Sequence, residues 1–194
     1  MSPAEVLVVL EENRTDEVVI STMGAEREWL KLSAHPRDFF YVPSSMGQAP
    51  TLGLGLALAR PHLRVIVLNG DGCMLMNLGC LVTIAEQSPP NYLLVVLNNG
   101  VYEVTGGQAL AGSGRVDFLS LAKAAGLPQV VRFGDVETWS AAVPEILQAT
   151  GPIFVELRVD PVRTGDIGPR APCPMPEQLT RFRRAITGGV SLPP

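Results

Sequence analysis

Two short polar clusters, each directly after an apolar run, are the residues best suited to chemistry in this sequence. They are Gly70-Asp71-Gly72 and Asn98-Asn99-Gly100. Asp71 and Asn99 offer carboxylate and amide oxygens, and such oxygens bind Mg²⁺ in proteins, usually together with phosphate oxygens of a substrate. The glycines let backbone N–H groups approach an anion closely. The two clusters therefore predict a site for a magnesium-bound phosphate group.

The clusters must meet at one edge of a sheet, and the pattern of the chain provides such a sheet. The 25 residues between Gly72 and Asn98 leave room for one helix and one strand. Apolar runs without alternation are typical of parallel strands that are buried on both faces. The expected strands are Val18–Thr22, Phe39–Val42, Val65–Asn69, Tyr92–Leu97, Gln129–Phe133 and Ile153–Val159. The expected helices between them are Ala25–Leu32, Ala49–Ala59, Met74–Gln87, Asp117–Ala125 and Val136–Ala149. This alternation predicts an α/β/α three-layer fold with a mostly parallel six-stranded sheet, in which ligands bind beyond the carboxyl ends of the strands.

Composition and charge exclude several classes of partner. With 46% apolar and 18% charged residues, the 194-residue chain is globular in composition and long enough for one domain with a sizeable core. A net charge of −4 without a basic run argues against a nucleic-acid surface. No apolar run approaches the roughly 18 residues of a membrane span. Three cysteines without metal-like spacing favour a reducing cytoplasm.

The two ends of the chain have their own patterns. Ser2-Pro3-Ala4-Glu5 is a helix-capping box with proline at the first helical position, which indicates a helix rather than a signal peptide. Glycine and proline gather in residues 161–176, which are expected to be irregular. A last amphipathic helix is expected at Glu177–Ile186.

The spaced pair of clusters resembles the thiamine-diphosphate motif, Gly-Asp-Gly followed some 25 residues later by Asn-Asn. The resemblance runs from about Val18 to Ile186, so residues 1–194 are interpreted as a single diphosphate-binding domain. In particular, the chain resembles the family of sulfopyruvate and phosphonopyruvate decarboxylases. The stretches that carry this resemblance are Gly70–Gly79, Asn98–Tyr102, Thr105–Gln108, Ser45–Ala49 and Gly53–Ala59. Thr105-Gly106-Gly107-Gln108 is the stretch that narrows the subfamily.

The resemblance implies thiamine diphosphate and Mg²⁺ as cofactors, a small 2-oxoacid as substrate, and a role for each matching residue. The implied Mg²⁺ ligands are Asp71, Asn99 and the backbone oxygen of Val101. The implied cofactor contacts are Gly24, Ser44, Ser45, Met46, Gly70, Asp71, Gly72, Cys73, Asn99, Val101 and Tyr102. Among these, Met46 would hold the cofactor in its bent V conformation, and the carbonyl of Ser44 would accept a hydrogen bond from the 4′-amino group. Gly72 and Cys73 would donate backbone N–H groups to the diphosphate.

One group that the resemblance requires has no counterpart in the sequence. Enzymes of this family activate the aminopyrimidine through a glutamate on a separate pyrimidine-binding domain, and 194 residues leave room for only one domain. Glu5, Glu11 and Glu12 lie in the first expected helix and do not resemble that glutamate motif. We therefore expect an α-type partner chain, an oligomer with the cofactor between subunits, and no turnover by this chain alone.

Three departures from the family pattern leave the substrate open. Glu26 stands where the relatives tend to have serine, Gln48 where they often have histidine, and Ser44 where they usually have glycine. A sulfonate or phosphonate tail calls for a cationic contact, and Arg115 is a candidate. The alternatives are an acetolactate-synthase-like thiamine-diphosphate subunit and a non-catalytic cofactor-binding or assembly module. A dinucleotide-binding or flavodoxin-like domain fits less well, because Met23-Gly24-Ala25-Glu26 is not Gly-x-Gly-x-x-Gly.

Overall fold

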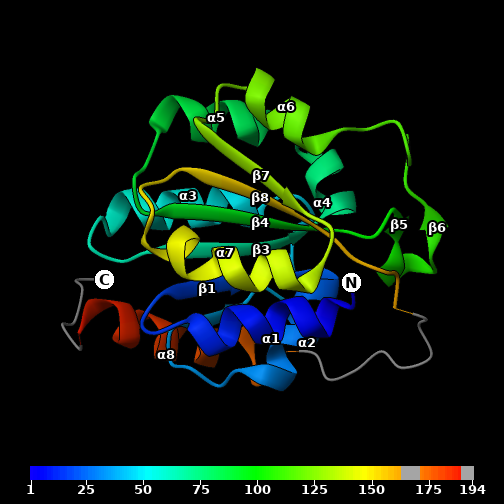
Figure 1. Ribbon diagram of the computed structural model, residues 1–194. Helices are drawn as coiled ribbons and strands as arrows, with labels where there is room; N and C mark the ends of the chain where they lie inside the picture. Colours follow the sequence, from blue (N-terminus) through cyan, green and yellow to red (C-terminus); the bar gives the residue numbers. More distant parts are fainter. Residues whose placement is uncertain (163–170, 189–194) are drawn as a thin grey trace.

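The computed structural model describes residues 1–162 and 171–188 and has three layers, with a central sheet between two layers of helices (Figure 1). The six strands lie in the order β2-β1-β3-β4-β8-β7, and every neighbouring pair is parallel. They are β1 (Val18–Ser21), β2 (Asp38–Phe40), β3 (Val65–Gly70), β4 (Tyr92–Asn98), β7 (Gln129–Phe133) and β8 (Ile153–Arg158). The predicted fold class is confirmed, and the sheet is parallel throughout.

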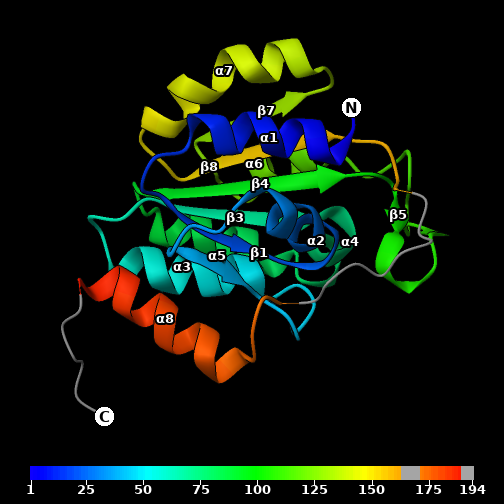
Figure 2. The same cartoon turned by 90° about the horizontal axis from the view of Figure 1, so that it is seen from below.

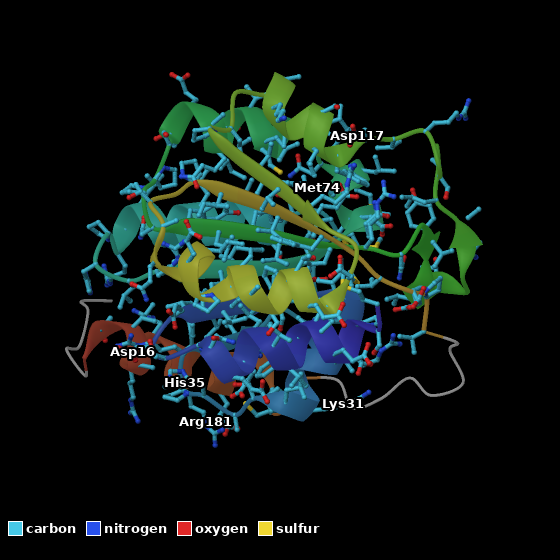
Figure 3. The ribbon with its side chains drawn as sticks, viewed as in Figure 1. Asp16, Lys31, His35, Met74, Asp117 and Arg181 are labelled. Atoms are coloured by element: carbon cyan, nitrogen blue, oxygen red, sulfur yellow. The ribbon has the colours of Figure 1, made fainter. Side chains whose placement is uncertain are left out.

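Helices cover both faces of the sheet, and each face has its own core (Figure 2). One layer consists of α1 (Pro3–Asn13), α2 (Met23–Leu32) and α7 (Val136–Gln148). The other consists of α3 (Ala49–Ala59), α5 (Gly79–Gln87), α6 (Phe118–Ala124) and α8 (Met175–Thr187), with the short α4 (Asp71–Met76) at the end of β3. Met74 of α4 is fully buried among the side chains between this layer and the sheet (Figure 3).

Local sequence explains several of these elements. The capping box is present at α1, because Ser2 accepts from the backbone of Glu5 and Glu5 accepts from the backbone of Ser2. Gly53 brings α3 close to the sheet, since a Cβ atom there would lie 2.3 Å from Cγ2 of Val67. Strands β3 and β4 are buried along nearly their whole length, as continuous apolar runs predict.

The predicted single helix over Met74–Gln87 is wrong. The first helix begins at Asp71 and ends at Met76, and a second begins at Gly79. At the break, Asn77 leaves the helical conformation with φ −148° and ψ 58°. Its side-chain amide donates to the carbonyl oxygen of Gly47 at 3.0 Å. This hydrogen bond to the loop before α3 stabilises the non-helical conformation at Asn77.

Other differences are smaller. The hairpin of β5 (Val101–Tyr102) and β6 (Gln108–Ala109) and the 3₁₀ turn η1 (Glu103–Thr105) were not predicted from the sequence. Of the segment expected to be irregular, residues 163–170 lie outside the described residues, and α8 begins two residues before the predicted start. The three cysteines are free. Among the described helices, none is long and apolar enough to cross a bilayer.

The strand order fixes where a ligand is expected. From β1 the chain moves outward to β2, whereas from β3 it moves the other way to β4, so the order reverses between β1 and β3. A crevice opens outside the carboxyl ends of the strands at such a reversal. Gly24 lies in the first turn of α2, directly after β1, and Asp71 is the first residue of α4, directly after β3. The fold therefore directs these two residues to the same crevice.

Candidate functional site

A cavity of about 300 Å³ occupies this crevice, which is within the range of small-molecule sites. The turns after β1 and β3, the end of β4 and the β5–η1 segment contribute most of its lining. Nine of the eleven predicted cofactor contacts line it, namely Gly24, Met46, Gly70, Asp71, Gly72, Cys73, Asn99, Val101 and Tyr102. Residues far apart in the sequence are thus brought together as the two polar clusters predicted.

Asp71 links the two clusters directly. Its carboxylate is 2% exposed, and Oδ1 accepts from the backbone N–H of Gly72 at 2.7 Å. Oδ2 accepts from the backbone N–H of Gly100, also at 2.7 Å. Burial raises the pKa of Asp71 above its usual value, and backbone N–H groups of Gly100, Gly72 and Asn99 oppose this rise. The carboxylate therefore stands at the junction of the two turns.

Asn99 and Val101 flank Gly100, whose backbone N–H bonds to Asp71. Oδ1 of Asn99 accepts from the backbone N–H of Val101 at 3.0 Å, and both residues line the cavity. Within the described residues, no group of three or more His, Cys, Asp or Glu side chains is placed to hold a metal ion. A cation here would rely on one carboxylate, an amide and a carbonyl oxygen, with phosphate oxygens completing its shell. That donor set fits Mg²⁺.

The ring of Tyr102 packs so closely against residue 72 that a side chain larger than that of glycine would collide with it. A Cβ atom at Gly72 would lie 2.8 Å from Cδ1 of Tyr102, so the ring covers this turn. Burial raises the pKa of the Cys73 thiol, which keeps it protonated near neutral pH. The thiol is then neutral, and the contact of the Cys73 backbone N–H with a diphosphate stays a prediction.

Methionines line the cavity, whereas the two predicted serines are not among its lining residues. Met46 and Met76 line the cavity and are each 48% exposed. Ser44 accepts a hydrogen bond from the hydroxyl of Thr22 at 3.3 Å, and the exposed Ser45 has its N–H directed at Tyr41 Oη. The structure does not bring Ser44 or Ser45 to the cavity wall, so their cofactor contacts stay predictions.

Glu103 is a cavity residue that reasoning from sequence missed. Its carboxylate accepts from Nη2 of Arg27 at 2.9 Å, from Nδ2 of Asn99 at 3.3 Å and from the backbone N–H of Val162 at 2.6 Å. Gly24 leaves space for this group, because a Cβ atom there would lie 2.8 Å from Oε2 of Glu103. The sequence feature that could have identified Glu103 is its position as an acidic residue four positions after Asn99, in a segment already assigned to the site.

The charges that line the cavity are acidic. Asp71, Glu28 and Glu103 line it, and no Lys or Arg does so among the described residues. Arg115 is exposed and lies outside the lining, so its contact with an anionic tail stays a prediction. An anionic ligand would therefore depend on backbone N–H groups and on a divalent cation for compensation.

Two of the departures from the family pattern lie away from the cavity. Glu26 is 4% exposed and does not line the cavity. Its Oε1 has no hydrogen-bond partner, and burial raises its pKa to about 7. Gln48 is exposed at the start of α3, where its side chain accepts from Thr51.

Comparison with known proteins agrees with this geometry. Residues 21–157 match the thiamine pyrophosphate enzyme, C-terminal TPP binding domain. The chain belongs to this family. It is 42% identical over 147 residues to the sulfopyruvate decarboxylase subunit beta of Methanothermobacter thermautotrophicus, covering 75% of each chain. It is 36% identical to the phosphonopyruvate decarboxylase of Streptomyces viridochromogenes, covering 92% of this chain and 44% of that protein.

A solved structure shows the same fold. The thiamine diphosphate-dependent 4-hydroxybenzoylformate decarboxylase of Rhodococcus jostii superposes with a TM-score of 0.71 at 22% identity. The match covers 84% of this chain and 33% of that one. The chain thus spans less than half the length of its single-chain relatives but three quarters of a relative named as a subunit.

Proposed function

We propose that this chain is the diphosphate-binding subunit of a split thiamine-diphosphate-dependent 2-oxoacid decarboxylase, of sulfopyruvate or phosphonopyruvate type. The observation that carries the proposal is the junction of Asp71 with the Asn99 turn at the reversal of strand order. Membership of the thiamine pyrophosphate family and the names of the most similar relatives support the choice of cofactor and reaction.

The residues of the chain would bind the diphosphate end of the cofactor. Asp71, Oδ1 of Asn99 and the carbonyl of Val101 would hold Mg²⁺. The N–H group of Cys73, and that of Gly72 once it is released from Oδ1 of Asp71, would face the diphosphate. The bound cofactor supplies an electron sink for the carbon–carbon bond that breaks. The adaptable side chain of Met46 would press against the cofactor, and the methionine-lined mouth would exclude water.

A partner chain would supply the activating glutamate. Both glutamates in the cavity are already engaged, because Glu28 pairs with Lys31 and Glu103 accepts from three donors. Met46, Met76 and Val104 leave apolar surface exposed around the mouth, which is typical of a surface that another chain covers. The match to the phosphonopyruvate decarboxylase of Streptomyces viridochromogenes covers only 44% of that protein.

Two measurements test the proposal together. Calorimetry of the isolated chain with thiamine diphosphate should show weak binding that requires Mg²⁺, and carbon dioxide release from sulfopyruvate or phosphonopyruvate should be absent. Adding a co-expressed chain of similar size with a pyrimidine-type domain should restore release. Robust turnover by the chain alone would overturn the split-enzyme assignment, and cofactor binding without any turnover in the complex would favour an assembly role.

A matched pair of variants tests the site itself. Asp71→Ala should abolish Mg²⁺-dependent cofactor binding, because it removes the carboxylate at the junction of the two turns. Asp16→Ala, an equal change of charge at an exposed carboxylate outside the cavity, should bind as the wild type does. Equal binding by both variants would contradict the assignment of the site.

A further inference from the structure

The carboxylate of Glu103 collects hydrogen bonds from three separate parts of the chain. Its side chain is 9% exposed, and its three donors come from α2, from the turn after β4 and from the segment that follows β8. Only one of these donors, the amide of Asn99, is a neutral side chain that lines the cavity.

The three donors differ in what else they are able to do. The guanidinium of Arg27 and the backbone N–H of Val162 only donate hydrogen bonds. The amide of Asn99 has a donor end and an acceptor end, and either end would fit the same space after a half turn. An ionised carboxylate only accepts, so Glu103 selects the donor end. The oxygen of Asn99 is thereby turned away from Glu103, to the side where Val101 donates to it at 3.0 Å.

This geometry matters because a divalent cation needs the oxygen and not the nitrogen. We propose that Glu103 is a positioning residue that fixes the amide of Asn99, so that its oxygen is presented with Asp71 to the metal ion of the cofactor. The inference rests on the proposed function, since it names a further residue of the same site. Partners of this kind orient metal ligands elsewhere, and their loss costs about 10–100-fold in metal affinity.

The two oxygens of the carboxylate have different partners. Arg27 pairs with Oε2 while Asn99 and Val162 bond to Oε1, so the two oxygens have separate tasks. Gly24 provides the space, because a Cβ atom there would lie 2.8 Å from Oε2. Gly24 therefore serves Glu103 in this structure, a requirement independent of the diphosphate contact predicted for it.

Replacing the carboxylate by an amide provides the first test. Glu103→Gln leaves three donors around a side chain with one acceptor oxygen. The charged Arg27 forms the stronger hydrogen bond and takes that oxygen. The new amide nitrogen then faces Asn99 and Val162, and of these only Asn99 is able to turn round and become an acceptor, which would direct its nitrogen toward the metal. Binding of Mn²⁺ to the full chain with saturating thiamine diphosphate, followed by electron paramagnetic resonance, should weaken at least about tenfold. Unchanged Mn²⁺ affinity would overturn the positioning role.

A second background separates orientation from general structural damage. Asn99→Asp presents an oxygen to the metal whichever way it turns, so the orienting role of Glu103 disappears. In the Asn99→Asp chain, Glu103→Gln should leave Mn²⁺ affinity unchanged or improve it, because the new amide donates to the new carboxylate. A structural role alone would produce the same fold loss in both backgrounds, and that result would overturn the proposal.

Further variants keep the test decisive. Arg27→Met removes the ion pair but leaves Asn99 its acceptor, so Mn²⁺ affinity should change by about threefold or less. Should Glu103→Gln not fold in thermal melts, Gly24→Ala displaces the carboxylate without removing any hydrogen-bonding group, and it should also weaken Mn²⁺ binding. A wild-type chain that binds no Mn²⁺ with the cofactor would refute the proposed function itself. Wild-type binding with unaffected variants would refute only the role of Glu103.

Discussion

Two buried carboxylates, one at the amino end of a strand and one beyond the carboxyl ends of the strands, have similar surroundings but different roles. Asp38, at the start of β2, accepts hydrogen bonds from Arg14 Nη1, Trp29 Nε1, Ser33 Oγ and the His35 backbone N–H. Glu103, in η1, accepts from Arg27 Nη2, Asn99 Nδ2 and the Val162 backbone N–H. Each carboxylate pairs with an arginine and joins segments that are distant in sequence.

The difference lies in what the donors do besides donating. None of the donors to Asp38 lines the cavity, and His35 and Asp16 lie at the end of the molecule away from the β5–β6 hairpin (Figure 3). Two donors to Glu103, Asn99 and Val162, line the cavity, and the side chain of Asn99 has an acceptor end as well as a donor end. The same local chemistry therefore stabilises the fold around Asp38, and around Glu103 it orients a group in the site.

The largest expected effect breaks the network around Asp38. Asp38→Asn leaves the buried Arg14 without its charged partner, and loss of one member of a buried pair costs about 3–5 kcal/mol. Urea unfolding should show this loss, while Mn²⁺ affinity of the folded variant should equal that of the wild type. Asp16→Asn, at the exposed pair with Arg37 next to Asp38 in the sequence, should cost less than about 1 kcal/mol. Weaker metal binding by Asp38→Asn would erase the contrast between the two carboxylates.

A third buried carboxylate, Glu26, has an oxygen without a partner, and its effect should depend on pH. Burial raises its pKa from 4.5 to about 7. Below pH 4.5 the group is protonated in both the folded and unfolded states. Between these two pKa values only the unfolded state releases the proton, so stability falls as pH rises, by about 3 kcal/mol in all. Above about pH 7 the penalty stays constant.

Glu26→Gln should remove this penalty, because an amide does not ionise. Its free energy of unfolding should exceed that of the wild type at pH 8, and the difference should shrink steadily toward pH 5. Glu145→Gln, at an exposed position on α7, provides the matched control and should show no such trend. A difference for Glu26→Gln that is independent of pH would show that its carboxyl is not held protonated by burial.

Sequence alone predicted the features that depend on local pattern. The continuous apolar runs gave the six strands, and the parallel arrangement then required the Asp71 and Asn99 turns to meet at one edge. Gly24 and Met46 were placed at the cavity through the family resemblance. Gly24, Asp71 and Asn99 lie within three residues of a strand end, so a correct sheet was enough to bring them together.

Features that depend on contacts between distant residues escaped prediction. The break after α4 depends on a hydrogen bond from Asn77 to Gly47, 30 residues earlier. The pair of Arg27 and Glu103 joins residues 76 positions apart. Helical periodicity and motif spacing contain no information about such pairs. A single acidic residue in a loop is also too common to indicate a role by itself.

A variant at Gly53, where α3 packs against β3, should have a smaller effect and should change stability without changing metal binding. A Cβ atom at Gly53 would overlap Val67, and overpacking of this kind costs about 1–3 kcal/mol. Gly53→Ala should therefore unfold at lower urea with unchanged Mn²⁺ affinity. Gly55→Ala, on the open face of the same helix, should gain up to about 1 kcal/mol. If Gly53→Ala also lost metal affinity, reduced affinity in other variants would no longer identify residues of the site.

The smallest expected effect belongs to Arg115, an exposed residue in the loop that follows the β5–β6 hairpin. Arg115→Ala should change the free energy of unfolding by less than about 0.5 kcal/mol, because its charge is solvated. Mn²⁺ affinity of the isolated chain should also stay unchanged, since Arg115 does not line the cavity. The assembled enzyme provides the sharper measurement. A raised KM for an anionic 2-oxoacid with unchanged kcat would mean that Arg115 binds substrate and transition state equally. In the assembled enzyme, the substrate site would then include Arg115, which does not line the cavity of the isolated chain.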